Sequence, residues 1–152
     1  MLEIPCDNVE RVFIHAGARA LEGDLRVPRD ATGLVLFAHG SGSSRHSSRN
    51  RFVAAALIAA ARHPSDVAAV VSRGGRPDLA AGWSGGVRAP TLLMVGGEDR
   101  TVIRLNEDAF EKLAAAEKSF EIVPGATHLF EEPGTLEAVE ELATEWFARH
   151  LR

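Results

Sequence analysis

Short apolar runs alternate with amphipathic stretches along most of the chain. An apolar run without alternation predicts a strand covered on both faces, and apolar positions spaced three or four residues apart predict a helix. The predicted buried strands are residues 33–38, 67–72, 91–95 and 120–123. The predicted helices are residues 49–63, 106–117 and 135–151, with a short helical turn over residues 77–81.

Two further strands precede this alternation. Residues 11–14 and 20–27 flank a turn over residues 16–19, which predicts an antiparallel hairpin. From residue 33 onward strand and helix alternate, and this order requires a parallel sheet with helices on both faces. The sequence therefore predicts an α/β fold, a three-layer α/β/α sandwich with a mostly parallel sheet and an N-terminal antiparallel hairpin. The length of 152 residues predicts one domain over residues 1–152.

Composition and charge exclude several classes of function. The net charge of -4 and the scattered basic residues, bunched only at Arg45, Arg49 and Arg51, offer no footprint for nucleic acid. The single cysteine, Cys6, fits a reducing compartment, and the N-terminus lacks the features of a signal peptide. No apolar run reaches the ~18 residues that a membrane span needs. We therefore expect a cytoplasmic protein that binds neither nucleic acid nor a membrane.

The histidines do not indicate a metal site. None of the six forms a ligand pair at helical or hairpin spacing, so we expect no metal ion and no cofactor. Four of them are expected to lie on the surface, namely His15, His46, His63 and His150.

The loops that follow the strands hold the candidate chemistry, because ligands bind at the carboxyl ends of the strands in open α/β sheets. Asp99 follows one predicted strand and His128 follows the next, so both loops open on the same edge and we expect the side chains within hydrogen-bond reach. A carboxylate there orients an imidazole as in the second half of a Ser-His-Asp triad. The alternative is that Asp99 is only a turn former or helix N-cap and His128 only a structural loop residue.

Four segments resemble the α/β-hydrolase superfamily, and within it the dienelactone-hydrolase-like proteins. They read LVLFAHGSGSSRHSSRNRFVA, VAAVVSRGGRPDLA, APTLLMVGGEDRTV and EIVPGATHLFEEPG, and together they cover most of the chain. The resemblance implies a sheet of the α/β-hydrolase type, Asp99 as the acid and His128 as the base. It also implies that the loop containing Gly40, Ser41 and Gly42 supplies backbone N–H groups to an oxyanion hole.

The chain departs from this family between residues 44 and 67, where no strand, Gly-x-Ser-x-Gly turn and helix occur in order. The resemblance implies an internal deletion that removes two strands, a helix and the nucleophile, joins two helical halves at Val53 and Ala54, and reduces the number of strands. One apolar face continues across the join, through Phe52, Val53, Ala56, Leu57, Ala60 and Ala61. We therefore predict one continuous helix that connects the strands at residues 33–38 and 67–72, which would be parallel and adjacent.

Two serines are candidate nucleophiles. Ser84 stands in a literal Gly82-Trp83-Ser84-Gly85-Gly86 motif, but neither a strand before it nor a helix after it is predicted, so we expect Ser84 to be dispensable. Ser41 follows a predicted strand and precedes a predicted helix, which makes it the better candidate. Flexible turns and N-caps are the competing roles for the serines of this loop.

The sequence leaves two functions open. The first is a Ser-His-Asp hydrolase, or esterase, that acts on a small-molecule carboxylic ester or lactone, with its activity dependent on a surviving nucleophile. The second is a non-catalytic relative that binds an anion or a protein partner through the Gly/Ser-rich loop 39–44, next to a helix N-terminus and Arg45. Neither Gly-Lys-Ser/Thr nor Gly-x-Gly-x-x-Gly is present to support phosphate binding. A homodimer is a further expectation, because deleted strands would leave a sheet edge uncovered.

Overall fold

The computed structural model describes residues 9–16, 19–26 and 51–151, with side chains described over residues 53–151. It consists of an N-terminal hairpin and an α/β unit, and each is described by itself. The predicted strand at residues 33–38 and the three loop residues Gly40, Ser41 and Gly42 lie outside the described residues.

The hairpin is formed by β1 (Val9–Ala16) and β2 (Arg19–Arg26). The two strands are antiparallel, with Val9 opposite Arg26 at one end of the ladder and Ala16 opposite Arg19 at the other. The predicted antiparallel pairing is therefore confirmed, with β1 extending beyond its predicted range at both ends and β2 shifted by one residue toward its amino end.

A three-stranded parallel sheet forms the centre of the α/β unit in the described part of the chain. Its order is β3 (Val70–Arg73), β4 (Thr91–Gly96) and β5 (Lys118–Val123). The central strand β4 is buried along its whole length, as its unbroken apolar run predicts. β3 begins later than predicted, because Val67 packs against the core without joining the ladder.

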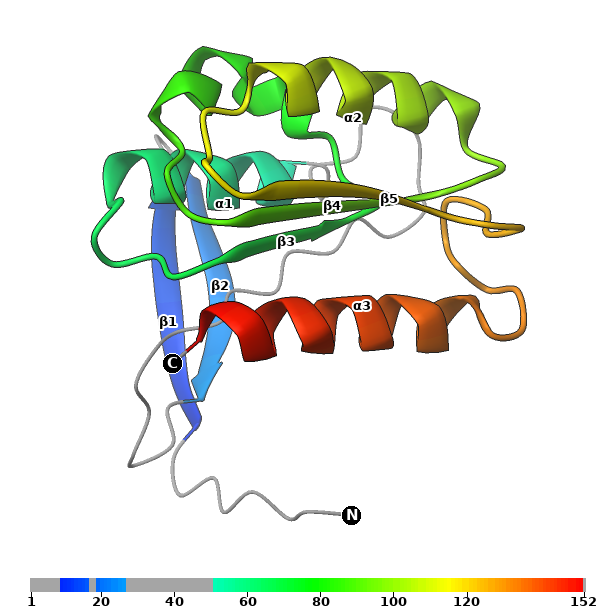
Figure 1. Ribbon diagram of the computed structural model, residues 1–152. Helices are drawn as coiled ribbons and strands as arrows, with labels where there is room; N and C mark the ends of the chain where they lie inside the picture. Colours follow the sequence, from blue (N-terminus) through cyan, green and yellow to red (C-terminus); the bar gives the residue numbers. More distant parts are fainter. Residues whose placement is uncertain (1–8, 17–18, 27–50, 152) are drawn as a thin grey trace. The chain divides into compact units, whose positions relative to one another are not determined.

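Helices cover both faces of this sheet (Figure 1). One face carries α1 (Arg51–Arg62), the 3-10 helix η2 (Pro77–Gly86) and α2 (Arg100–Lys112), and the other carries α3 (Thr135–His150). Alternate residues of β4 serve the two faces, since Leu93 belongs to the α1 side and Leu92 and Met94 to the α3 side. The predicted three-layer α/β/α arrangement is confirmed.

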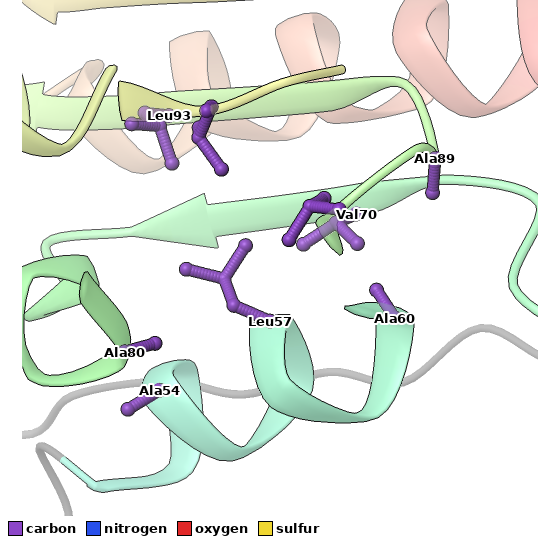
Figure 2. Close-up of a cluster of buried hydrophobic side chains, with 9 residues drawn as sticks. Ala54, Leu57, Ala60, Val70, Ala80, Ala89 and Leu93 are labelled. Carbon is purple, nitrogen blue, oxygen red and sulfur yellow. The ribbon is translucent and has the colours of Figure 1, made fainter. Parts of the chain in front are cut away.

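Helix α1 runs through Val53 and Ala54 without a break, which confirms the predicted continuity of the joined segment. Figure 2 shows its apolar side facing β3, with Leu57 and Ala60 directed at Val70. Val53, Ala54, Leu57 and Ala60 are buried, whereas the predicted stripe members Ala56 and Ala61 are partly exposed. The pairing of residues 33–38 with β3 lies outside the described residues and stays a prediction.

Helix α2 corrects the prediction of a helix at residues 106–117. It begins at Arg100, because the Asp99 side chain accepts a hydrogen bond from the Val102 N–H and caps the first turn. It ends at Lys112, where Leu113 turns to an extended conformation. The ammonium of Lys118 then donates to the carbonyl oxygens of Phe110 and Leu113, which satisfies the free end of the helix.

Helix α3 matches its predicted range within one residue, but not all of its apolar side chains are buried. Leu136 is half exposed, because the buried stripe is centred on Val139, Ala143 and Trp146. His150 was expected on the surface, yet its side chain is 9% exposed and its ring lies 4.6 Å from the Trp146 ring. No helix among the described residues is long and apolar enough to cross a membrane.

Candidate active site

The carboxyl ends of β4 and β5 carry the two predicted site residues on adjoining loops. The Gly97 N–H donates to the carbonyl oxygen of Val123 over 2.9 Å, and the Glu98 N–H donates to that of Ala126 over 3.0 Å. These bonds join the loop that follows β4 to the loop that follows β5. Asp99 and His128 therefore come together by backbone pairing as well as by their own contact.

Gly96 makes this close approach possible. A β-carbon at this position would overlap the carbonyl oxygens of Ala126 and Thr127, which press against the end of β4. Because both obstacles are backbone atoms, no change of side-chain rotamer relieves the overlap. Any larger residue at position 96 would push the two loops apart.

Asp99 and His128 form the hydrogen bond that the sequence predicted. Asp99 Oδ2 lies 2.7 Å from His128 Nδ1, and the two side chains are 15% and 30% exposed. Asp99 Oδ1 accepts a hydrogen bond from the Val102 N–H at 3.3 Å. The carboxylate is thus both the N-cap of α2 and the hydrogen-bond partner of the imidazole, so Asp99 is not only a helix cap. His128 Nε2 makes no hydrogen bond to any described residue.

The loop around His128 is held by two further features. The Thr127 N–H donates to Glu132 Oε2 at 3.0 Å, and hydrogen bonds from Thr127, its side chain first and its backbone second, lower the pKa of the Glu132 carboxyl. Phe130 has a left-handed backbone with φ of 57° and a buried ring. A non-glycine residue keeps such a backbone only where its surroundings enforce it, so the loop has a defined shape.

Ser84 does not occupy a nucleophile elbow. It lies inside η2, it is buried, and its hydroxyl contacts the carbonyl oxygen of Ala80 at 3.5 Å. Its own carbonyl oxygen accepts from the Ala114 N–H, in the segment that leads into the amino end of β5. Ser84 therefore lies near the amino ends of the strands, whereas Asp99 and His128 lie at the carboxyl ends. This agrees with the expectation that Ser84 is not the nucleophile.

The other candidate residues have different outcomes. Ser41 and the oxyanion candidates Gly40 and Gly42 lie outside the described residues, so their roles stay predictions. Among the described residues, no group of three histidine, cysteine, aspartate or glutamate side chains could hold a metal ion. The sequence analysis missed Gly96 and Glu132, although a glycine directly after a buried strand is a signal for close backbone approach.

A parallel sheet flanked by helices, with an acid and a histidine on successive carboxyl-end loops, is the arrangement that α/β hydrolases use for the acid and histidine of their triad. The crystal structure of a dienelactone hydrolase from Anabaena variabilis ATCC 29413 is similar to this chain, with a TM-score of 0.74 and 39% identity, and the match covers 95% of this chain and 99% of that one. The chain belongs to the dienelactone-hydrolase-like family.

Two curated relatives come from Mycobacterium tuberculosis, strains CDC 1551 and H37Rv, and each is described as "Putative phosphoribosyl transferase". Each is 40% identical to this chain over 207 positions, which include 93% of this chain and 46% of the relative. The chain thus spans about half the length of the curated relatives it matches. No protein-family model matches the chain.

The length of this match bears on the internal deletion. The matched stretch has 207 positions and the chain has 152 residues, so at least 55 positions of the relatives have no counterpart here. This number of unmatched positions is large enough to include two strands, a helix and the turn between them. The position of the join at Val53 and Ala54 stays a prediction.

Proposed function

We propose that the chain is a hydrolase that acts on small carboxylic esters or lactones in the cytoplasm, with Asp99 and His128 as its acid and base. The observation that carries this proposal is the 2.7 Å contact between Asp99 Oδ2 and His128 Nδ1 at the carboxyl edge of the parallel sheet. The contact uses Nδ1, so Nε2 is the nitrogen left to exchange a proton with a nucleophile. This is the division of roles in a Ser-His-Asp triad.

The mechanism needs one hydroxyl in addition to this pair. We assign it to Ser41, whose oxygen attacks the carbonyl carbon while His128 Nε2 takes its proton. The backbone N–H groups near Gly40, Ser41 and Gly42 stabilise the negative oxygen of the tetrahedral intermediate. His128 returns the proton to the leaving alkoxide, and a water molecule then hydrolyses the acyl-serine by the same route in reverse. Asp99 holds the imidazole in the tautomer that this proton transfer requires.

Phosphoribosyl transfer, which is the activity in the name of the mycobacterial relatives, is less well supported for this chain. The chain spans less than half of those proteins, and it lacks both common phosphate-binding sequence patterns. The dienelactone hydrolase, in contrast, is matched over nearly all of both chains. We therefore assign the hydrolase reaction to the part of the relatives that this chain represents.

The test is hydrolysis of p-nitrophenyl acetate together with labelling by a fluorophosphonate probe. We expect a burst of p-nitrophenol from the wild-type chain, its loss in His128→Ala, and loss of labelling in Ser41→Ala. Ser84→Ala is the matched control, and we expect it to keep both signals. Labelling that is abolished by Ser84→Ala and kept by Ser41→Ala would reverse the assignment of the nucleophile.

Absence of both burst and labelling in the folded wild-type chain would reject the hydrolase. It would favour the second function, a non-catalytic relative that binds an anion or a protein partner through loop 39–44. Binding of inorganic phosphate, measured by calorimetry and weakened in Arg45→Ala, would then support the anion-binding form.

A further inference from the structure

Asn106 lies in the middle of α2 and is completely buried, with 0% of its surface exposed. Its Nδ2 donates one hydrogen bond to the carbonyl oxygen of Gly75 at 3.0 Å and another to that of Val102 at 2.9 Å. Its Oδ1 has no partner among the described residues. Burial of an unpaired amide oxygen costs free energy that an apolar residue would avoid, so core packing alone does not explain an asparagine here.

The segment that Asn106 holds, Gly74 and Gly75, lies against the histidine loop. The Gly74 N–H donates to the carbonyl oxygen of Met94 at 2.8 Å, which fixes the segment to the end of β4. A β-carbon on Gly74 would lie 3.4 Å from the His128 carbonyl oxygen and 3.9 Å from His128 Nδ1. Gly74 has φ of +56°, which favours glycine. The histidine loop therefore approaches Gly74 so closely that a side chain there would meet the His128 carbonyl oxygen.

Gly75 leaves the segment no room to move toward the core. A β-carbon there would overlap the side chains of Val53 and Ser72. The segment is thus confined by packing on the core side, by Met94 along the sheet and by Asn106 on the α2 side. Asn106 makes the one side-chain hydrogen bond to this segment among the described residues.

We propose that Asn106 is a positioning residue for His128 and acts through Gly75 and Gly74. Helix α2 then sets the imidazole from two places, because its N-cap Asp99 contacts Nδ1 and its central Asn106 holds the Gly74–Gly75 backbone beside the histidine loop. The inference rests on the proposed function in so far as His128 is the base. The geometric part, that Asn106 fixes the place of His128, stands on the contacts alone.

Two variants and one control separate positioning from general stability. Asn106→Ala removes both donors, whereas Asn106→Ser keeps a hydroxyl that reaches Val102 but not Gly75 and is the milder change. Ala109→Gly is the control, because Ala109 is buried on the same helix and bonds to neither loop. Each protein is compared at the same interval below its own Tm, so that a general loss of stability is matched.

The first readout is nuclear magnetic resonance. The wild-type chain should show a downfield, slowly exchanging proton on His128 Nδ1, as a short bond to a carboxylate produces. In both Asn106 variants we expect the Nδ1 proton to exchange with solvent so fast that its signal is lost. The Gly74 amide should exchange about tenfold faster or more, because the segment opens locally. Ala109→Gly should leave both signals as in the wild type. Equal changes in the control and the Asn106 variants, or no change in any of them, would overturn the proposal.

The second readout is hydrolysis of p-nitrophenyl acetate. If the wild-type chain turns over, the Asn106 variants should lose about 10- to 100-fold in kcat with KM unchanged, because a displaced base weakens the transition state and not substrate binding. A rise in KM at constant kcat would contradict a positioning role. If the wild-type chain does not turn over, the proposed function fails, and the resonance experiment alone decides whether Asn106 positions His128.

Discussion

Two substitutions of Asp99 separate the hydrogen bonds made by its two carboxylate oxygens. Oδ1 caps α2 through the Val102 N–H, and Oδ2 binds His128 Nδ1. Alanine removes both bonds. Asparagine keeps an oxygen for the cap, since asparagine and aspartate are about equally good N-caps, but it replaces the carboxylate that faces the imidazole.

The expected magnitudes follow from these two contacts. Loss of an N-cap costs about 1 kcal/mol, within a range of about 0.5–2 kcal/mol. Because both side chains are partly exposed, the bond to His128 contributes only about 0.5–1 kcal/mol to stability. We therefore expect Asp99→Ala to destabilise the fold by about 1.5–2 kcal/mol, and Asp99→Asn by about 0.5–1 kcal/mol. His128→Ala, which leaves the cap intact, should resemble Asp99→Asn.

Urea unfolding of these variants and of the double variant Asp99→Ala/His128→Ala measures the contributions of the helix cap and of the contact with His128 to the free energy of unfolding. The double-mutant cycle should give a coupling of about 0.5–1 kcal/mol between the two side chains. At this chain length, each kcal/mol lowers Tm by roughly 3 °C, so thermal scans give a second estimate of each difference. If Asp99→Asn destabilises as much as Asp99→Ala, the capping role is wrong. If the coupling is zero, the contact with His128 contributes nothing to stability.

Three further predictions concern the packing and the pH dependence of the fold. Gly96→Ala should destabilise by about 1–3 kcal/mol in urea unfolding, because its β-carbon overlaps the histidine loop, whereas Gly82→Ala, which has open space, should be nearly neutral; equal effects would refute the close-approach argument. Leu57→Ala should cost about 3 kcal/mol because Leu57 is buried at the centre of the α1 contact, and a cost no larger than that of the partly buried control Ile58→Ala would show that α1 is not part of the core. The pKa of the Glu132 carboxyl is lowered in the folded state, so this group contributes stability that is complete above the ordinary value of 4.5 and is lost as the pH falls below it. The difference in unfolding free energy between the wild type and Glu132→Gln should therefore shrink on acidification. A difference that grows on acidification would contradict this prediction.

The parts of the fold that could be predicted from sequence are those where one signal acts alone. The run Thr91 to Gly96 is buried throughout and has no competing pattern, so β4 was predicted within one residue. The meeting of Asp99 and His128 follows from topology, because loops after neighbouring parallel strands share an edge. Neither prediction required knowledge of side-chain packing.

The start of α2 could not be predicted, because its buried stripe contains a polar residue. The inward positions of this helix are Val102, Asn106 and Ala109, and an asparagine in the middle of the stripe hides the helical period in the first half. The reason for that asparagine is its hydrogen bond to Gly75, a residue 31 positions earlier in the chain. A contact between such distant segments leaves no trace in a local pattern.

The prediction that His150 lies on the surface was wrong for a related reason. His150 follows Trp146 by one helical turn, and the two rings are in contact at a tilt of 56° in the last turn of α3. Glu117 approaches His150 Nε2 to 3.3 Å from the segment before β5. His150 shares the buried face of α3 with Trp146, because the side chains at i and i+4 lie on one face of a helix.

The contacts of the described residues are compatible with the proposed internal deletion, because the folded core and the Asp99–His128 pair do not depend on the residues before the join. The bonds that place Asp99 come from Gly96, Val102 and His128, and all of them lie far beyond the proposed join. Helix α1 contributes to the core beside β3 through Ala54, Leu57 and Ala60. All three residues follow the proposed join. The proposed deletion, which would rejoin the helix in phase, would therefore leave the packing of the sheet and the acid–histidine pair intact.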